Sequence, residues 1–277
     1  MNYSISDMLS FTFMQRALIV GIPVALCAAL LGVSLILKRY SMIGDGLSHV
    51  GFGALALAAA MNLAPLKVAI PVVVVSAFLL LRISENSKIN GDGAIAIVSS
   101  SALAVGIVVT SVTGGLNTDL YSYLFGSILA LSKEDVVLSL VLCFVVLFVY
   151  IFFYNKIFSV TFDESFSLAT GTNAKAYNMV IALLTALTVV LGMQIMGTLL
   201  ISSLIIFPGL TAMRVFKSYK AVVISAAVQS VVCVAAGLFV SFYAETATGA
   251  TVVCINLACF IVFAAIGFFR TIGFSKK

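Results

Sequence analysis

The chain alternates long apolar segments with short polar ones. Nine apolar segments follow one another, at 14–37, 47–63, 66–82, 94–113, 135–154, 177–195, 197–213, 221–242 and 250–269. A helix of about twenty apolar residues crosses the hydrocarbon of a bilayer, whereas the strands of a membrane β-barrel alternate apolar and polar residues over about ten positions. The pattern therefore predicts an all-α, polytopic bundle of transmembrane helices, formed as a single domain over residues 1–277.

The number of spans depends on two very short connections. The second and third apolar segments are joined by Leu63-Ala64-Pro65-Leu66, and the sixth and seventh are separated only by Met196. Proline disfavours helical backbone at the residue before it, and broken helices are tolerated in membranes where protein surrounds them. Each pair is therefore either a tight hairpin or one broken helix, which predicts eight or nine spans.

Composition supports a membrane protein and excludes a soluble one. Apolar residues make up 62% and charged residues 9% of the chain, against about half and about a quarter in ordinary globular domains. The first apolar segment is too long for the core of a secretory signal and lacks an A-x-A-like cleavage site, so we expect a retained span. The five cysteines lie in apolar segments without a C-x-x-C spacing, which indicates buried hydrophobic side chains.

The basic residues predict the orientation. With the N-terminus outside and an odd number of crossings, the cytoplasmic side holds twelve basic residues: Lys38, Arg39, Arg82, Lys88, Lys156, Lys175, Arg214, Lys217, Lys220, Arg270, Lys276 and Lys277. Only Arg16, Lys67 and Lys133 fall outside. This positive-inside bias predicts a cytoplasmic C-terminus and accounts for the net charge of +5 without a nucleic-acid partner.

A stretch between the fourth and fifth apolar segments differs from an ordinary loop. Gly114–Ser132 contains an apolar core, Leu120–Leu131, that is too short to cross the hydrocarbon. We expect a re-entrant or interfacial segment on the outer side of the membrane. A buried loop is the alternative.

A second unusual stretch, at residues 161–171, predicts a short helix on the cytoplasmic side. Asp163 and Glu164 suit the first turn of a helix, and Gly171 suits its end. A stripe spaced i, i+4 and i+7 is formed by Phe162, Phe166 and Ala169. This helix either lies among the lipid headgroups or docks a cytosolic partner.

An acid and the only histidine of the chain, Asp45 and His49, stand four residues apart at the start of an apolar segment. On a helix, this spacing puts both side chains on one face, one turn apart. Divalent first-row cations accept imidazole and carboxylate ligands, and an ionisable residue within a membrane segment generally marks a solute or proton pathway. The pair predicts a metal site completed by water, backbone carbonyls or a second copy of the chain. Alternatively, Asp45 caps the helix and His49 hydrogen-bonds within the bundle.

Small and polar residues accompany this pair. Gly44 and Ser48 allow neighbouring backbones to approach closely, which a narrow channel and dense helix packing both require. Within the seventh apolar segment, Pro208 removes a backbone donor and frees a carbonyl. The hydroxyls that could satisfy the freed groups are those of Ser202, Ser203 and Thr211. We interpret all six residues as pathway or packing positions.

Four motifs resemble one family of membrane proteins. "KRYSMIGDGLSH" at Lys38–His49 is similar to a basic pair followed by G-D-x-L-[SA]-H, and "MGTLLISSLIIFPGLTA" at Met196–Ala212 is similar to G-x-L-L-[IV]-[ST]-x-L-x-[IV]-x-P-x-x-[TS]-A. Weaker matches are "DLYSYLFGSILALSKEDV" at Asp119–Val136 and "TGATVV" at Thr248–Val253. Over nearly its whole length, the chain resembles the membrane-permease subunit of bacterial ATP-binding-cassette importers for zinc, manganese or iron.

The chain departs from the pattern of this family at several positions. Ala250, and Thr246 or Ala247 upstream, stand where the family has prolines, which predicts a looser outer turn. Gly46 replaces a common alanine and Gly209-Leu210 a common pair of alanines, so the dimensions of the pore stay open.

The resemblance implies the partners and the roles of the residues. Two permease copies would form a homodimer in the lipid bilayer of a bacterial inner membrane, pair with two cytosolic ATPases, and receive the ion from an extracytoplasmic metal-binding protein. Asp45 and His49 would form the intramembrane metal site. The coupling helix that docks the ATPase would comprise Phe162, Asp163, Glu164, Phe166, Ala169 and Gly171. The chain carries no phosphate-binding P-loop motif, so we expect a transporter subunit rather than an enzyme, with no permanently bound cofactor.

The motifs predict the transported ion and the energy source less directly than the family. The "YLFG" at residues 123–126 with Glu134-Asp135 resembles zinc permeases, so we expect Zn²⁺ first, Mn²⁺ second and Fe²⁺ third. An alternative is a secondary metal transporter driven by an ion gradient, which needs ionisable residues near the midplane for coupling ions. Only Asp45 and His49 approach that requirement. A membrane scaffold without a substrate is a third possibility, in which both residues would be dispensable.

Overall fold

A computed structural model describes residues 10–86, 91–113, 126 and 132–275, and these residues form helices joined by short connections. The helices are α2 (Thr12–Leu37), α3 (Met42–Ala60), α4 (Pro65–Asn86), α5 (Gly91–Val112), α7 (Lys133–Phe152), α8 (Tyr154–Phe162), α9 (Glu164–Ala169), α10 (Ala174–Met196), α11 (Thr198–Val215), α12 (Tyr219–Ala244) and α13 (Thr248–Ser275). The prediction of an all-α bundle is confirmed.

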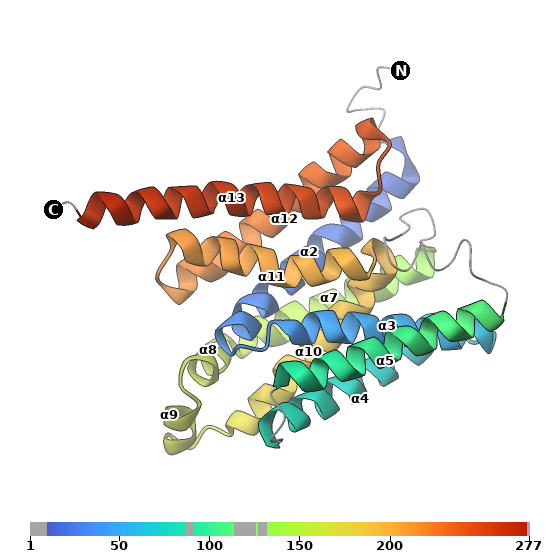
Figure 1. Cartoon of the computed structure of the whole chain (residues 1–277), viewed down its shortest axis with the longest axis horizontal. Helices are drawn as coiled ribbons and strands as arrows, with labels where there is room; N and C mark the ends of the chain where they lie inside the picture. The colour runs from blue at the N-terminus through green and yellow to red at the C-terminus, as the bar shows by residue number, and fades with distance from the viewer. Residues whose placement is uncertain (1–9, 87–90, 114–125, 127–131, 276–277) are drawn as a thin grey trace.

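Nine of the helices in the described ranges are long and apolar enough to cross a membrane, namely α2, α3, α4, α5, α7, α10, α11, α12 and α13. Successive spans run in opposite directions, so α2 begins and α13 ends at opposite ends of the bundle (Figure 1). The sequence predicts eight or nine spans, and the described part of the chain has nine.

Both short connections separate two helices rather than interrupting one. Residues 61–64 turn the chain between α3 and α4, with Asn62 in the left-handed region at φ 54°. Gly197 alone separates α10 from α11, and its φ and ψ are 84° and 163°. The prediction that Met196 separates these segments is wrong by one residue, because Met196 still belongs to α10. Only glycine adopts this backbone conformation readily, which explains why the break falls at Gly197.

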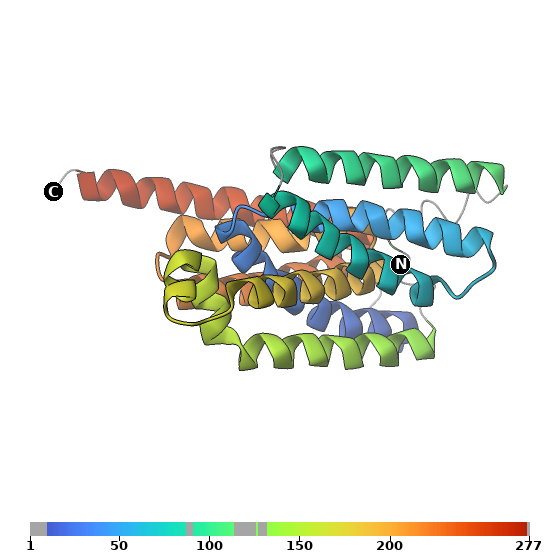
Figure 2. The ribbon, with the colours of Figure 1, turned by 90° about the horizontal axis from the view of Figure 1, so that it is seen from below.

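A largely buried span is α2, which contacts α7, α8, α10, α11 and α12. Within its most apolar stretch, 72% of the residues are buried, against 11% for the corresponding stretches of α5 and α13. Figure 2 shows α5 and α13 along one side of the bundle, where α5 packs on α3, and α13 packs on α11 and α12. The outer faces of α5 and α13 are therefore available to lipid or to another protein chain.

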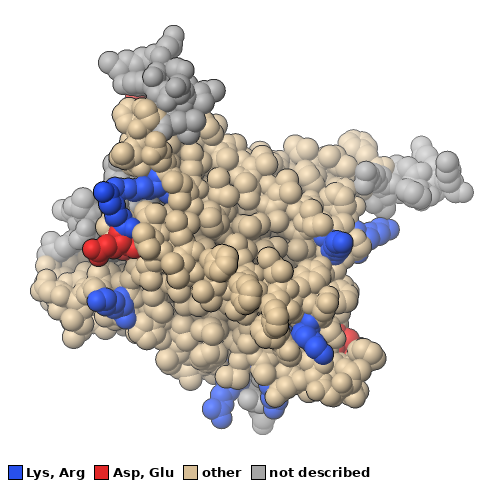
Figure 3. Space-filling view, turned by 180° about the vertical axis from the view of Figure 1, so that it is seen from behind, with Lys and Arg blue, Asp and Glu red and all other residues tan. Residues whose placement is uncertain are grey.

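Charged side chains keep to the ends of the spans. Figure 3 shows lysine and arginine side chains near the edges of one face, with a broad uncharged area across its middle. The described helix ends at one end of the bundle carry Lys38, Arg39, Arg82, Lys156, Lys175, Arg214, Lys217 and Lys220, and those at the other carry Arg16, Lys67 and Lys133. The described basic residues thus divide between the two ends as the sequence predicts.

Hydroxyl groups hold the turn between α12 and α13. This is the turn in which the permease family that the chain resembles has prolines. Glu245 adopts φ 52° and ends α12. The Ser241 hydroxyl donates to the carbonyl of Thr246 at 2.6 Å and contacts the hydroxyl of Thr248 at 2.9 Å. The hydroxyls of Thr246 and Thr251 lie 2.8 Å apart. These bonds connect both sides of the turn that the sequence predicts to be looser.

The predicted re-entrant core, Leu120–Leu131, lies outside the described residues except for Gly126. The described part of the same motif forms the start of α7. There the Ser132 hydroxyl accepts a hydrogen bond from the Asp135 amide at 3.0 Å, and the Asp135 carboxylate accepts one from the Ser132 amide at 3.3 Å. This capping box satisfies backbone donors at the start of the helix.

Replacing Gly197 with alanine tests the break between α10 and α11. We expect the free energy of unfolding to fall by about 1–3 kcal/mol, because a residue with a Cβ is strained in this backbone region. Unfolding by denaturant in detergent micelles measures the loss. Gly209→Ala is the control, since its added Cβ would be too close only to the flexible end of the Ile36 side chain, at 2.6 Å, and would lie in ordinary contact with Val33. Equal losses in the two variants would contradict the assignment.

Candidate metal site

The start of α3 carries the acid–histidine pair that the sequence predicts. Asp45 lies in the first turn of α3, and His49 follows one turn later. The residue at the N-cap is Ser41, whose side chain makes no capping hydrogen bond. Among the described residues, the partner of the Asp45 carboxylate is His49 and not the helix terminus. The geometry therefore favours the pair over the capping alternative.

The two side chains lie side by side and are partly open. Nε2 of His49 is 3.7 Å from Oδ2 of Asp45, and the side chains are 24% and 36% exposed. Nδ1 of His49 is buried and has no hydrogen-bond partner among the described residues. The alternative in which His49 hydrogen-bonds within the bundle is therefore not seen, and one ring nitrogen has no protein acceptor or donor.

The separation suits two ligands of one small ion. Ligand atoms each about 2.1 Å from an ion lie about 3.4 Å apart at the tetrahedral angle, and the observed separation is 3.7 Å. The described residues contain no group of three or more His, Cys, Asp or Glu side chains able to hold a metal. A full coordination shell would therefore need water, backbone carbonyls or another chain.

A contact with α11 fixes the turn of α3 between the two ligands. The buried Ser48 hydroxyl donates to the carbonyl of Asp45 at 2.7 Å and lies 3.3 Å from the hydroxyl of Ser202. A Cβ added to Gly44 would lie 2.7 Å from Cδ1 of Ile205, so the absence of a side chain lets α11 approach. The structure thereby brings the two most specific sequence motifs together at the pair.

The other residues that the sequence predicts as pathway or packing positions all lie in α11. The hydroxyls of Ser202 and Ser203 donate to the carbonyls of Thr198 and Leu200, at 3.0 and 2.8 Å. They therefore do not satisfy the carbonyl that Pro208 frees. Pro208 is buried within a helix that continues to Val215. Thr211 is fully buried and its hydroxyl has no partner.

The short helix predicted at residues 161–171 is present as α9 and is preceded by a separate helix, α8. The Asp163 carboxylate caps α9 by accepting a hydrogen bond from the Phe166 amide at 2.8 Å. Gly171 follows the helix with φ 79°. Phe162, Phe166 and Ala169 are exposed, as the stripe requires. The single-helix prediction is wrong for Phe162, which ends α8 and packs its ring against Tyr219 with centroids 6.0 Å apart.

Sequence reasoning missed a polar cluster that ties α9 to the end of α2. Lys38 donates to Oδ1 of Asn178 at 2.6 Å and lies 3.4 Å from Oε2 of Glu164. The Asn178 amide donates to both Glu164 oxygens, at 3.3 and 3.4 Å. The Lys38 side chain is only 7% exposed. The sequence shows only that Lys38 follows an apolar segment directly, as basic residues at the cytoplasmic ends of spans commonly do, so its burial could not be predicted.

Comparison with known proteins places this architecture in a group of transport proteins. The sequence model of a family described as "ABC 3 transport family" matches residues 10–267. The chain is 29% identical over 252 residues to "High-affinity zinc uptake system membrane protein ZnuB" of Haemophilus influenzae, covering 91% of this chain and 97% of that one. It is 31% identical over 252 residues to "Manganese import system permease protein ScaB" of Streptococcus gordonii, covering 91% and 90%.

A solved structure shares the fold. It contains "PsaBC from Streptococcus pneumoniae in complex with Fab" and matches this chain with a TM-score of 0.84 and 31% sequence identity. The match covers 94% of this chain and 93% of that chain. The family match over residues 10–267 includes α3, α9 and α11.

Lys38→Met tests the cluster between α2, α9 and α10. We expect the free energy of unfolding to fall by about 1–3 kcal/mol, because the buried Asn178 oxygen loses its donor. Denaturant unfolding in micelles measures this loss. Lys67→Met, an exposed lysine at the other end of the bundle, is the control and should change stability by less than about 0.5 kcal/mol. A loss no greater than that of the control would show that the cluster contributes nothing to stability.

Proposed function

The chain belongs to the ABC 3 transport family, and on that premise we propose that Asp45 and His49 hold a Zn²⁺ ion in transit through the membrane. Family membership makes the chain the multi-pass membrane permease of an ATP-binding-cassette importer for divalent metal ions. ATP hydrolysis belongs to a partner chain. This excludes the alternative of a transporter driven by an ion gradient.

One observation carries the proposal: an imidazole and a carboxylate 3.7 Å apart, both partly open, in an otherwise apolar span. A divalent ion cannot enter hydrocarbon without replacements for its lost water, since bare charges are very costly there. Two protein ligands supply part of the replacement. An incomplete shell also lets the ion leave, which conduction requires as much as entry.

The order of metals rests on chemistry and on the sequence motif. Zn²⁺ accepts nitrogen and oxygen ligands in a small coordination shell, and "YLFG" with Glu134-Asp135 resembles zinc permeases. We therefore propose Zn²⁺ first, Mn²⁺ second and Fe²⁺ third. The names of similar proteins do not decide this order, because the zinc and manganese proteins are 29% and 31% identical to the chain.

We propose that the permease works as a homodimer. A second copy would bring another acid–histidine pair. One copy supplies only two ligands at this site among its described residues, so the coordination shell of the ion could accept ligands from the other copy. The exposed apolar faces of α5 and α13 offer surface for such a contact. An extracytoplasmic binding protein would deliver the ion at the end opposite α9.

We propose further that α9 faces the cytoplasm and docks the ATPase. Phe166 and Leu168 are 61% and 54% exposed at the end of the bundle that holds most of the described basic residues. Positive charge favours the cytoplasmic side, which puts the N-terminus outside and the C-terminus in the cytoplasm of a bacterial inner membrane. Glu164 links α9 to Lys38, and Lys38 stands four residues before the start of α3. A displacement of α9 would thus reach the metal-site helix through few contacts.

Replacing Asp45 or His49 with alanine tests the metal site. We expect each variant to lower ATP-dependent Zn²⁺ uptake by at least about tenfold, since loss of even an outer-shell partner costs roughly 10–100-fold in metal affinity. Uptake is measured with ⁶⁵Zn in proteoliposomes that contain the permease and its ATPase. Glu245→Asn, which changes an exposed acid at the other end, directly after α12, is the control and should retain uptake.

Growth experiments with the same variants test which metal is transported. They also test the alternative of a membrane scaffold without a substrate. A deletion strain carrying each variant is grown under zinc starvation and under manganese starvation. Zinc specificity predicts that the wild-type gene restores growth only under zinc starvation. Normal growth of the Asp45→Ala, His49→Ala double variant under both conditions would refute a transport role for the pair.

Phe166→Ala tests the docking role of α9. Exposed aromatic side chains are often anchors of interfaces, with losses of about 2 kcal/mol when truncated, so we expect the affinity for the ATPase to fall by about thirtyfold. Microscale thermophoresis of the two purified subunits measures the affinity. Phe144→Ala is matched to it, because Phe144 is also exposed, at 70%, but lies on the span α7. Equal affinities of the two variants would argue for a helix that only lies among headgroups.

A further inference from the structure

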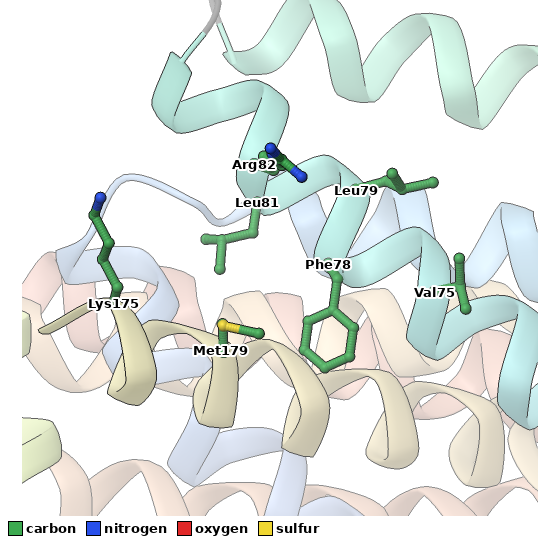
Figure 4. Close-up of a pocket in the computed structure, with 7 residues that line it drawn as sticks. All are labelled: Val75, Phe78, Leu79, Leu81, Arg82, Lys175 and Met179. Atoms are coloured by element: carbon green, nitrogen blue, oxygen red, sulfur yellow. The ribbon is translucent and has the colours of Figure 1, made fainter. Parts of the chain in front are cut away.

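A cavity separates the last turns of α4 from the first turns of α10. Its volume is about 480 Å³, within the range of about 300–1,000 Å³ that is usual for small-molecule sites. The lining residues are Val75, Phe78, Leu79, Leu81, Arg82, Lys175 and Met179. Figure 4 shows Phe78 and Met179 on the facing sides of the gap, with Lys175 and Arg82 towards one end. No part of the metal site lines this cavity.

The lining has an apolar part and a cationic part. On α4, Val75, Phe78, Leu79 and Arg82 follow the spacing i, i+3, i+4 and i+7 that places them on one helix face. On α10, Lys175 and Met179 are one turn apart. Because α4 ends where α10 begins, both cations stand at the same end of the cavity.

The depth of these residues matches the layers of a bilayer. The apolar spans are Pro65–Ile83 in α4 and Ala174–Met193 in α10, so Arg82 and Lys175 stand at the margin of the hydrocarbon. The apolar lining residues lie further inside. Val75, Leu79 and Met179 are 56%, 54% and 50% exposed, so this lining faces the surroundings of the bundle and not its core.

The two cations are not neutralised by the described part of the chain. Neither Arg82 nor Lys175 forms an ion pair with a described residue, and Glu164 at this end is paired with Lys38. Basic pockets between transmembrane helices attract anionic headgroups, and each cation near the membrane surface strengthens the attraction by about fivefold. A ligand with a negative head and a long apolar tail satisfies both parts of the cavity.

We propose that this cavity binds an anionic phospholipid of the surrounding bilayer. The phosphate lies between Arg82 and Lys175, and an acyl chain runs along Phe78, Leu79 and Met179. A water-soluble ATPase does not reach the apolar lining within the span. A second permease copy placed symmetrically on this surface would bring the same two cations against each other. The proposal does not depend on the metal site, so either can fail without the other.

The test uses the purified permease–ATPase complex in nanodiscs. The discs contain phosphatidylcholine with either phosphatidylglycerol or further phosphatidylcholine, and native mass spectrometry counts the lipids that remain bound after the disc is removed. We expect the wild type to retain phosphatidylglycerol in preference to phosphatidylcholine. The Arg82→Gln, Lys175→Gln double variant should lose this preference by about 25-fold, since each cation contributes about fivefold.

Matched variants show whether a loss of lipid retention comes from the cavity itself, from the lower positive charge of the protein or from misfolding. Lys217→Gln with Lys220→Gln removes two exposed cations near the start of α12, at the same end of the bundle, and should keep the preference. Met179→Trp fills the apolar part without changing charge and should also lower retention. Gel filtration and thermal unfolding check that each variant is folded and still binds the ATPase.

Several results would overturn the proposal. Equal retention of both lipids by the wild type would do so, as would an unchanged preference in the Arg82→Gln, Lys175→Gln variant. Loss of ATPase binding in that variant with unchanged lipid retention would assign the surface to the ATPase. Loss of the dimer with unchanged lipid retention would assign it to a second copy.

Discussion

The proposed metal site depends on how closely the neighbouring helices approach α3. Apolar attraction cannot hold helices together in lipid, because lipid tails are as apolar as the side chains, so association relies on small residues and close packing. Gly44 of α3 and Gly32 of α2 both face Ile205 of α11, and Gly53 of α3 faces the Ala102 carbonyl of α5. These approaches hold α3 from two sides. The carboxylate and imidazole one turn apart then share an environment that the packing fixes.

Polar contacts between distant segments complete this arrangement. Ser48 and Ser202 join α3 to α11, and Lys38, Glu164 and Asn178 join the end of α2 to α9 and α10. These contacts stabilise the bundle, since a polar group that is buried without a partner is costly. The short connection between α2 and α3 therefore has the metal-site turn on one side and the α9 cluster on the other. Only a few residues therefore separate the proposed ion site from the contacts of α9, the proposed docking helix.

The sequence was most informative where the relevant pattern is local. Continuous apolar segments predicted the spans, the i, i+4 spacing predicted that Asp45 and His49 face one another, and Asp163 predicted the start of a short helix. It was least informative about partners far apart in the chain. Lys38 and Glu164 are separated by 126 residues, and Ser48 and Ser202 by 154, and neither separation leaves a periodic signal. The change from α8 to α9 was missed because Phe162 and Phe166 keep helical spacing across the cap at Asp163.

The single residue between α10 and α11 has a mechanical consequence. With no further linker, the direction of α11 relative to α10 is set by the two torsion angles of Gly197. A small rotation there is amplified along α11, because its far end lies 18 residues, or about 27 Å, from the pivot. Ser202 lies near the pivot and moves little, whereas Val215 lies at the end of the lever arm. Any rotation at Gly197 would therefore displace the end of α11 near α9 more than it displaces the contact between Ser202 and Ser48.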